Sequence, residues 1–167
     1  MVWSSTSRAL LRLNFVFCEL NQAEFPAYVA MVAERWPSAQ IAVSFVASST
    51  DVVPRERSLV PRYSDVLPHL AAGVRLARDR GVTLTGFESM CGVPLCLVPD
   101  DVSAYASIAE IPAGTDRGEF QKPEACASCA LETRCFGVRR GYAELHGTSE
   151  IRPVPRRPDG AAERAAE

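Results

Sequence analysis

Two short apolar runs decide the fold of this chain, Leu13-Asn-Phe-Val-Phe-Cys18 and Ile41-Ala-Val-Ser-Phe-Val46. Aromatic and branched side chains dominate both runs almost without interruption. This pattern is typical of strands that are buried on both faces, as in a parallel sheet. Between them, residues 24–36 carry apolar side chains at spacings of three and four, which predicts a helix. The order strand, helix, strand predicts a βαβ unit.

The same order continues along the chain. Ser64 and Asp65 are suited to the start of a second helix, as a cap and a first-turn acid. Gly81 is suited to its end. The sequence then predicts a third strand over residues 82–86. We expect the inner face of this helix to consist of Leu67, Leu70, Val74 and Ala77.

Three strands with two crossover helices predict an α/β fold, and they are too few to close a barrel. We therefore interpret residues 1–86 as the last strands of a partial (β/α) barrel in a larger protein, with a small complete three-layer domain as the alternative. Residues 87–152 contain five of the six cysteines and predict a mostly irregular extension, closed by a helix at 136–146. Residues 153–167, rich in Pro, Arg and Ala, are expected to be disordered.

The charge balance excludes two classes of partner. The 167 residues carry 18 Lys and Arg against 20 Asp and Glu, a formal net charge of -2. Neither nucleic acid nor an anionic membrane is therefore expected, and no stretch approaches the roughly 20 apolar residues of a membrane span. Because no export signal is recognisable, we expect a cytoplasmic protein, in which six cysteines indicate metal or redox chemistry rather than disulfides.

Three cysteines form a metal-binding pattern. Cys126-Ala-Ser-Cys129 is a CxxC turn that can direct both sulfurs at one centre, and Cys135 follows after five further residues. Four thiolates bind either Zn²⁺ or an iron–sulfur cluster. Zinc sites usually pair two such turns, so the single one favours a [4Fe–4S] cluster, with zinc as the alternative. Free or disulfide-forming thiols are the third interpretation.

The fourth ligand must come from an earlier segment. Cys96 is favoured, because Pro94 stiffens its loop and a leucine on either side can anchor that loop in the core. Cys91 is the reserve ligand. Cys18, within an apolar strand, is expected to be an inert small hydrophobe.

These residues resemble the C-terminal part of radical SAM enzymes that carry a SPASM- or twitch-like extension. The matching pieces are Gly92-Val-Pro-Leu-Cys96, Lys122-Pro-Glu-Ala-Cys126-Ala-Ser-Cys129, Cys135-Phe-Gly137 and Tyr142. The resemblance implies a partial (β/α)6 barrel followed by an extension that holds one auxiliary [4Fe–4S] cluster. It also implies contacts with S-adenosylmethionine (SAM) after the first two strands, at Asn21 and Ser48, where ordinary strand-end capping is the alternative.

The chain departs from that family in ways that limit its chemistry. The CxxxCxxC motif of the catalytic cluster and the Gly-Gly-Glu segment that meets SAM do not occur, and Arg139 stands where a full SPASM domain has a further cysteine. We therefore expect one cluster, with an electron-relay or structural role, and no SAM cleavage unless a separate polypeptide supplies the rest of the barrel. The substrate would be a peptide or a small molecule. The alternatives are a non-catalytic binding module stapled by zinc on the four cysteines, and a functionless product of gene decay.

Overall fold

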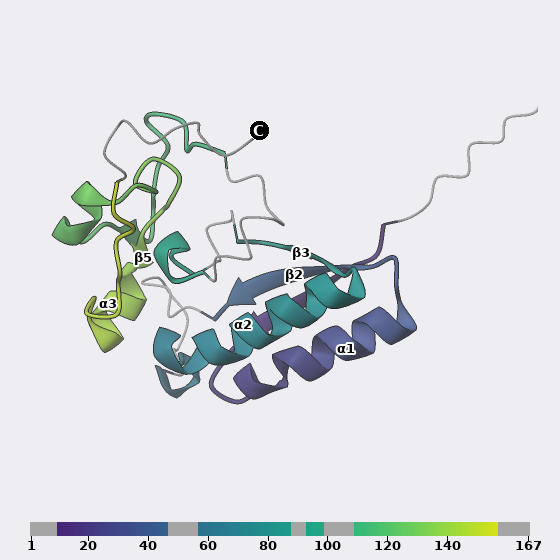
Figure 1. Cartoon of the computed structure of the whole chain (residues 1–167). Helices are drawn as coiled ribbons and strands as arrows, with labels where there is room; N and C mark the ends of the chain where they lie inside the picture. The colour runs from purple at the N-terminus through teal and green to yellow at the C-terminus, as the bar shows by residue number, and fades with distance from the viewer. Residues whose placement is uncertain (1–9, 47–56, 88–92, 99–108, 157–167) are drawn as a thin grey trace, which may run out of the picture.

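The structure, a computed structural model, describes residues 10–46, 57–87, 93–98 and 109–156. It is a mixed α/β fold with three parallel strands in the order β1-β2-β3 (Figure 1), which confirms the predicted α/β class, while the partial barrel stays a prediction. Within the described ranges there is no closed barrel and no helix long and apolar enough to cross a membrane. The elements of this part are β1 (Arg12–Phe17), the 3₁₀ turn η1 (Gln22–Glu24), α1 (Phe25–Arg35), β2 (Gln40–Phe45), η2 (Arg57–Leu59), α2 (Tyr63–Arg80) and β3 (Thr83–Thr85).

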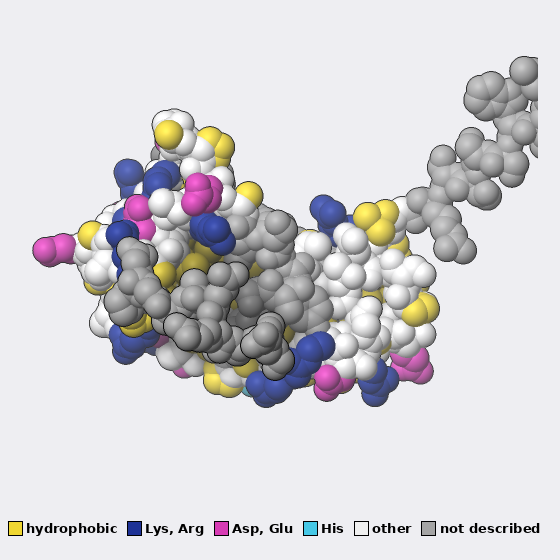
Figure 2. Space-filling view, turned by 45° about the horizontal axis from the view of Figure 1, so that its top comes forward, with side chains coloured by type: hydrophobic (Ala, Val, Ile, Leu, Met, Phe, Trp, Pro, Cys, Tyr) yellow, Lys and Arg dark blue, Asp and Glu magenta, His cyan; other side chains and the backbone are white. Residues whose placement is uncertain are grey.

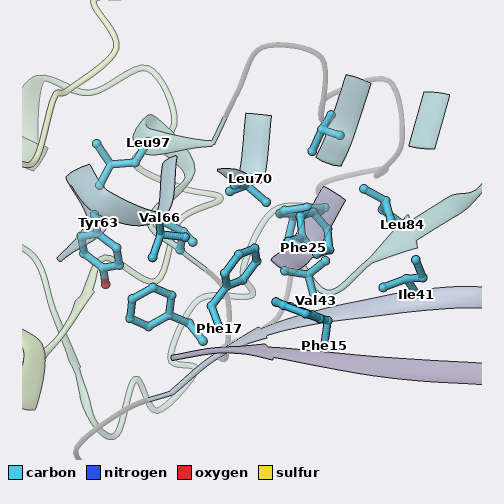
Figure 3. Close-up of a cluster of buried hydrophobic side chains, with 14 of the residues drawn as sticks. Phe15, Phe17, Phe25, Ile41, Val43, Tyr63, Val66, Leu70, Leu84 and Leu97 are labelled. Atoms are coloured by element: carbon cyan, nitrogen blue, oxygen red, sulfur yellow. The ribbon is translucent and has the colours of Figure 1, made fainter. Parts of the chain in front are cut away.

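The sheet is buried on one face only, so the prediction of strands buried on both faces is wrong. Helices α1 and α2 lie side by side along the same face (Figure 1). Alternate residues of β1 and β2 are buried, namely Phe15, Phe17, Ile41, Val43 and Phe45. Figure 3 shows the first four of them between the sheet and these helices. On the other face Arg12, Asn14 and Val16 are exposed. Polar side chains on this face form a hydrogen bond across the strands, in which Ser44 Oγ donates to Asn14 Oδ1 at 3.0 Å.

The two helices approach each other closely at Gly73 of α2. A Cβ added at this position would lie 2.2 Å from Cδ1 of Phe25 on α1. Phe25 is fully buried, and its ring packs against Phe15 and Phe17 at centroid distances of 5.0 Å and 4.9 Å. Because the ring has little room to move, the contact between the helices requires a glycine here.

We expect Gly73→Ala to lower the free energy of unfolding by about 1–3 kcal/mol, the usual cost of overpacking a core. This holds although alanine favours a helix by up to about 1 kcal/mol over glycine. Chemical denaturation measures the difference. The double variant with Phe25→Leu should lose less than the sum of the two single losses, because leucine relieves the contact. A Gly73→Ala variant as stable as the wild type would contradict this packing.

Helix α2 matches its prediction at the end and in part at the start, where Asp65 is the predicted first-turn acid. It ends at Arg80, and Gly81 adopts the left-handed conformation (φ 69°) expected of a C-terminal glycine. On its inner face Val66 is buried in place of the predicted Leu67, which is half-buried. Ser64 is not the cap, because α2 already begins at Tyr63 and its N-cap position makes no side-chain hydrogen bond.

The cysteine-rich part consists of short elements, η3 (Leu95–Leu97), β4 (Phe120–Gln121), η5 (Glu124–Ser128), β5 (Val138–Arg139) and α3 (Arg140–His146). Strands β4 and β5 pair antiparallel. The helix was predicted over 136–146, but α3 begins at Arg140, four residues after the predicted start. Gly137 has a φ of 98°, and the two residues after it are extended against β4.

Residues 153–156, predicted to be disordered, pack against the cysteine segment. The N–H of Ala130 donates to the Val154 carbonyl at 2.8 Å, and Pro155 forms a β-bridge with Cys129. The predicted start of the tail at residue 153 is therefore too early, because these backbone groups pair with the turn after the CxxC. Residues 157–167 lie outside the described ranges.

Candidate metal centre

Cys96 is positioned by a 3₁₀ turn that its neighbours anchor. The N–H of Leu97 donates to the Pro94 carbonyl at 2.9 Å and closes the turn. Leu95 and Leu97 are buried, as predicted for residues that fix this loop to the core. Cys96, between them, is half-buried.

The other three thiols come from consecutive turns. The N–H of Cys126 donates to the Pro123 carbonyl at 2.8 Å, and the N–H of Cys129 donates to the Cys126 carbonyl at 3.0 Å. The CxxC sequence is thus one tight turn. A second turn follows, in which the N–H of Cys135 donates to the Leu131 carbonyl at 3.0 Å.

All four cysteines predicted as ligands line one cavity, Cys96, Cys126, Cys129 and Cys135. None of them forms a disulfide. The cavity has a volume of about 20 Å³, which is room for about one water molecule. In the described ranges, no group of three or more His, Cys, Asp or Glu side chains is arranged to hold a single metal ion. The four thiols therefore line one space, but in the described ranges they do not form a group that could hold a metal ion as they stand.

Burial keeps two of these thiols protonated. It raises the pKa of Cys96 to about 11, with the other three cysteines adding to the shift and a hydrogen bond from the Arg152 backbone opposing it. The pKa of Cys126 is also raised, first by burial and then by Cys135 and Cys129. In the metal-free chain at neutral pH both groups are thiols, so a metal centre must displace their protons on binding.

Gly137 brings backbone donors close to the cavity. Its N–H donates to Sγ of Cys135 at 3.3 Å, the kind of contact that orients a thiolate ligand. A Cβ added to Gly137 would lie 2.3 Å from the Gln121 carbonyl oxygen, and the residue has a positive φ. Both facts restrict the position to glycine.

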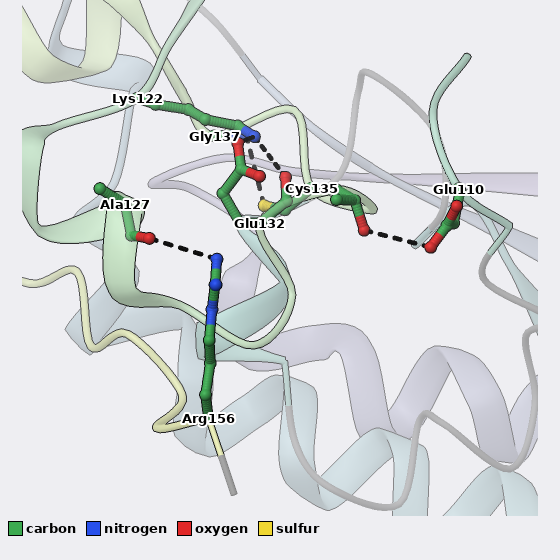
Figure 4. Close-up of polar contacts among 8 residues, drawn as sticks. Glu110, Lys122, Ala127, Glu132, Cys135, Gly137 and Arg156 are labelled. Atoms are coloured by element: carbon green, nitrogen blue, oxygen red, sulfur yellow. Dashed lines mark hydrogen bonds and ion pairs between the residues drawn. The ribbon is translucent and has the colours of Figure 1, made fainter. Parts of the chain in front are cut away.

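One ion pair forms part of the cavity wall. Lys122 Nζ lies 2.7 Å from Glu132 Oε1, and it also donates to the Glu132 backbone carbonyl. Both residues line the cavity together with the cysteines. Figure 4 shows the pair beside Cys135 and Gly137.

The chain between residues 137 and 153 leaves the cavity and returns to it, because residues 137, 138, 151 and 153 all line the wall. Its middle carries α3, which docks on the start of α2. The Tyr142 ring stacks on the Tyr63 ring at a centroid distance of 3.9 Å. His146 Nε2 lies 3.0 Å from the Val60 carbonyl oxygen. One segment thus connects the cysteine cavity to helix α2.

Tyr142 and Glu150, here called the clasp, cap the N-terminus of α2. The N–H of Tyr63 donates to the Tyr142 hydroxyl at 2.9 Å, and the N–H of Ser64 donates to Glu150 Oε1 at 2.9 Å. The Tyr142 hydroxyl in turn donates to Glu150 Oε2. A carboxylate is favourable here, because a helix N-terminus attracts negative charge.

The clasp should make stability depend on pH. Burial alone would raise the pKa of Glu150, but hydrogen bonds from Tyr142 and Ser64 lower it overall. A carboxyl with a lowered folded-state pKa stabilises the fold above its unfolded pKa of about 4.3, and this contribution is lost as pH falls through the folded pKa. We expect Glu150→Gln to lose about 1–2 kcal/mol at neutral pH, and the difference from wild type to close as the pH falls below about 4.

Urea titrations of both proteins at about pH 7 and about pH 3.5 measure that difference. Glu144→Gln is the matched control, since Glu144 is an exposed residue of α3. A difference that stays constant with pH would show that Glu150 acts by packing and not by charge.

The remaining predicted residues are placed as follows. Asn21 Oδ1 accepts from the Cys18 N–H at 2.9 Å, and Asn21 Nδ2 donates to the Val16 carbonyl at 2.9 Å. This is the strand-end capping that the sequence offered as the alternative, and a SAM contact of Asn21 stays a prediction. Cys18 is half-buried and is not part of the cavity wall. Ser48 and the reserve ligand Cys91 lie outside the described residues.

Three residues of the site were not predicted. Lys122 belongs to the run quoted for the resemblance, and Glu132 is a charged residue between Cys129 and Cys135. Their positions in the cysteine motif could have indicated that both lie near the thiols. Glu150 carried no such signal, because its partner Ser64 is 86 residues away in the chain.

Comparisons with protein-family models, with curated proteins and with solved structures found no match. The fold and the site define a mixed α/β chain in which four thiols line one cavity.

Proposed function

We propose that Cys96, Cys126, Cys129 and Cys135 hold one auxiliary [4Fe–4S] cluster, and that the chain is the C-terminal, cluster-holding part of a radical SAM-type protein. The observation that carries the proposal is the cavity itself. Cys96 is separated from Cys126 by 30 positions, yet both thiols line the same small space. A common ligand would explain why thiols so far apart in the chain meet at one cavity.

The cysteine pattern favours a cluster over zinc, because the chain has a single CxxC turn. One zinc ion binds four thiolates at about 2.3 Å, and zinc sites usually pair two CxxC turns. The cavity has room for about one water molecule, so the turns that carry the thiols must move apart to admit a four-iron cluster. In a [4Fe–4S] cluster each thiolate binds a different iron, so the sulfurs stand farther apart.

The one-sided sheet supports the barrel interpretation. In a (β/α) barrel, helices cover only the outer face of the strands, and the inner face points into the barrel. The helix-covered apolar face and the polar face with Asn14 and Ser44 correspond to these two surfaces. β1 and β3 each pair with β2 alone in the described part of the chain, so further strands could join at either side.

The proposed role is electron relay or structural support. Four protein ligands leave no open iron for a substrate. The sequence lacks the CxxxCxxC of a catalytic cluster, so SAM cleavage would require barrel strands and a cluster from chain beyond this sequence. With a completed barrel, SAM and a peptide or small-molecule substrate would bind at the carboxyl ends of the strands, on the polar face.

The first experiment is the iron, sulfide and zinc content of protein purified without oxygen, together with its absorption spectrum. We expect about four irons and four sulfides per chain, with absorbance near roughly 400 nm. One zinc per chain and no colour after attempted cluster reconstitution would overturn the proposal in favour of a zinc-stapled binding module.

A further inference from the structure

Lys122 and Glu132 form an ion pair in the cavity wall. Among the described residues that line the cavity, Lys122 is the only cation and Glu132 the only carboxylate. The Lys122 side chain is 16% exposed and that of Glu132 is 34% exposed, so the ammonium is the better shielded of the two charges. The pair keeps the ammonium at the wall through both the carboxylate and the backbone carbonyl of Glu132.

Two further cations lie close enough to act on Glu132, the half-buried Arg117 and the exposed Arg156, whose guanidinium donates to the Ala127 carbonyl at 3.3 Å. The remaining cations of the region have other partners or are exposed. Arg139 pairs with Glu119, and its guanidinium lies 4.9 Å from the centroid of the Phe120 ring. Arg134, Arg140 and Arg152 are exposed, so water screens their charges. Basic and acidic side chains are interspersed over the coloured part of the face in Figure 2. The nearest shielded charges should therefore dominate the potential inside the cavity.

A cluster bound by four thiolates is anionic, and reduction adds one more negative charge to it. A cation at the wall stabilises the reduced form more than the oxidised form and raises the reduction potential, whereas a carboxylate does the reverse. Lys122 and Glu132 act with opposite signs on the same centre. Their ion pair limits the net effect of each.

We propose that Lys122 tunes the reduction potential of the cluster, and that Glu132 is the counter-charge that limits this effect. The inference rests on the proposed function, because it requires a cluster in the cavity. It goes beyond that function by naming the residues that set how readily the centre accepts an electron.

Opposite charge changes at the pair give the test. Redox titration with dithionite, followed by EPR, measures the potential of the reconstituted cluster in each variant. We expect Lys122→Met to lower the potential and Glu132→Gln to raise it. Each change should alter the equilibrium constant for reduction several-fold, up to about tenfold, and a tenfold change corresponds to about 59 mV for one electron.

Matched controls separate tuning from structure. Arg35→Met and Glu34→Gln remove the same charges at the exposed end of α1, and Figure 1 shows this helix away from the cysteine-rich part. They should leave the potential unchanged, and Lys122→Arg should stay close to wild type. If Lys122→Met fails to hold iron, Glu132→Gln decides the question alone, because it keeps the lysine.

The outcomes are distinguishable. Loss of stability in both variants, with iron bound and the potential unmoved or shifted in one common direction, would overturn the inference and leave the proposed function standing. A wild-type chain that binds no iron would overturn the proposed function and this inference with it.

Discussion

Cys129→Ser is expected to reduce metal retention by at least about 100-fold, because in the proposed centre it would replace a thiolate ligand by a group that binds soft metals poorly. Cys129 is 6% exposed and is the most buried of the four cysteines in the cavity wall. A metal that binds the folded chain but not the unfolded chain stabilises the folded state. The variant should therefore lose both its metal and several kcal/mol of unfolding free energy. Metal analysis after gel filtration and thermal unfolding measure the two losses.

Cys18→Ser is the matched control, since it makes the same chemical change outside the cavity wall. It should keep the wild-type metal content. The proposal that these four cysteines share one centre would be contradicted if Cys129→Ser kept its metal, or if both variants lost metal equally.

Gly137→Ala is expected to have the second-largest effect. The new methyl group would lie 2.3 Å from the Gln121 carbonyl oxygen, and alanine would be held at a φ of 98°. The backbone strain costs about 1–3 kcal/mol, and the collision adds about as much again. Relief of the collision would separate β4 from β5 and displace the N–H that donates to Cys135. We therefore expect lower stability and a weakened metal centre.

Gly114→Ala provides the control for Gly137. Gly114 has a φ of 80°, but a Cβ there would meet no atom within 4 Å. It therefore reports the strain of a positive φ without the collision. Metal content and urea denaturation of both variants separate the two effects. Equal losses would show that the contact with Gln121 has no importance.

The local sequence predicted the sheet and its helices well, because these depend on spacing along the chain. The apolar runs at 13–18 and 41–46 correspond to β1 and β2 within one residue at each end, and Gly81 ends α2 as expected. The error concerned the second face of the strands. A run such as Leu13-Asn-Phe-Val-Phe carries one polar residue, and that residue does not reveal that helices cover only one side of the sheet.

The cysteines that line the cavity were predicted, and a metal between them stays a prediction. The CxxC and the following cysteine indicated a metal centre from local spacing alone, and the leucines beside Cys96 indicated how its loop is anchored. The charged pair at the wall and the clasp were missed. Lys122 and Glu132 meet across 10 positions, and Tyr142 reaches Tyr63 across 79. No periodicity links residues at such separations.

By itself, the sequence determined three things. These are the α/β class, the alternation of strands and helices along the chain, and the four cysteines that are candidate ligands. Hydrophobic periodicity, glycine conformation and short motifs are properties of neighbouring residues. Only the tertiary structure decided which face of the sheet is covered, which space the thiols share and which carboxylate caps α2. Those features arise where distant segments pack together, and Glu150 at the start of α2 is the clearest instance, because a backbone donor left without a local cap takes the nearest acceptor in space.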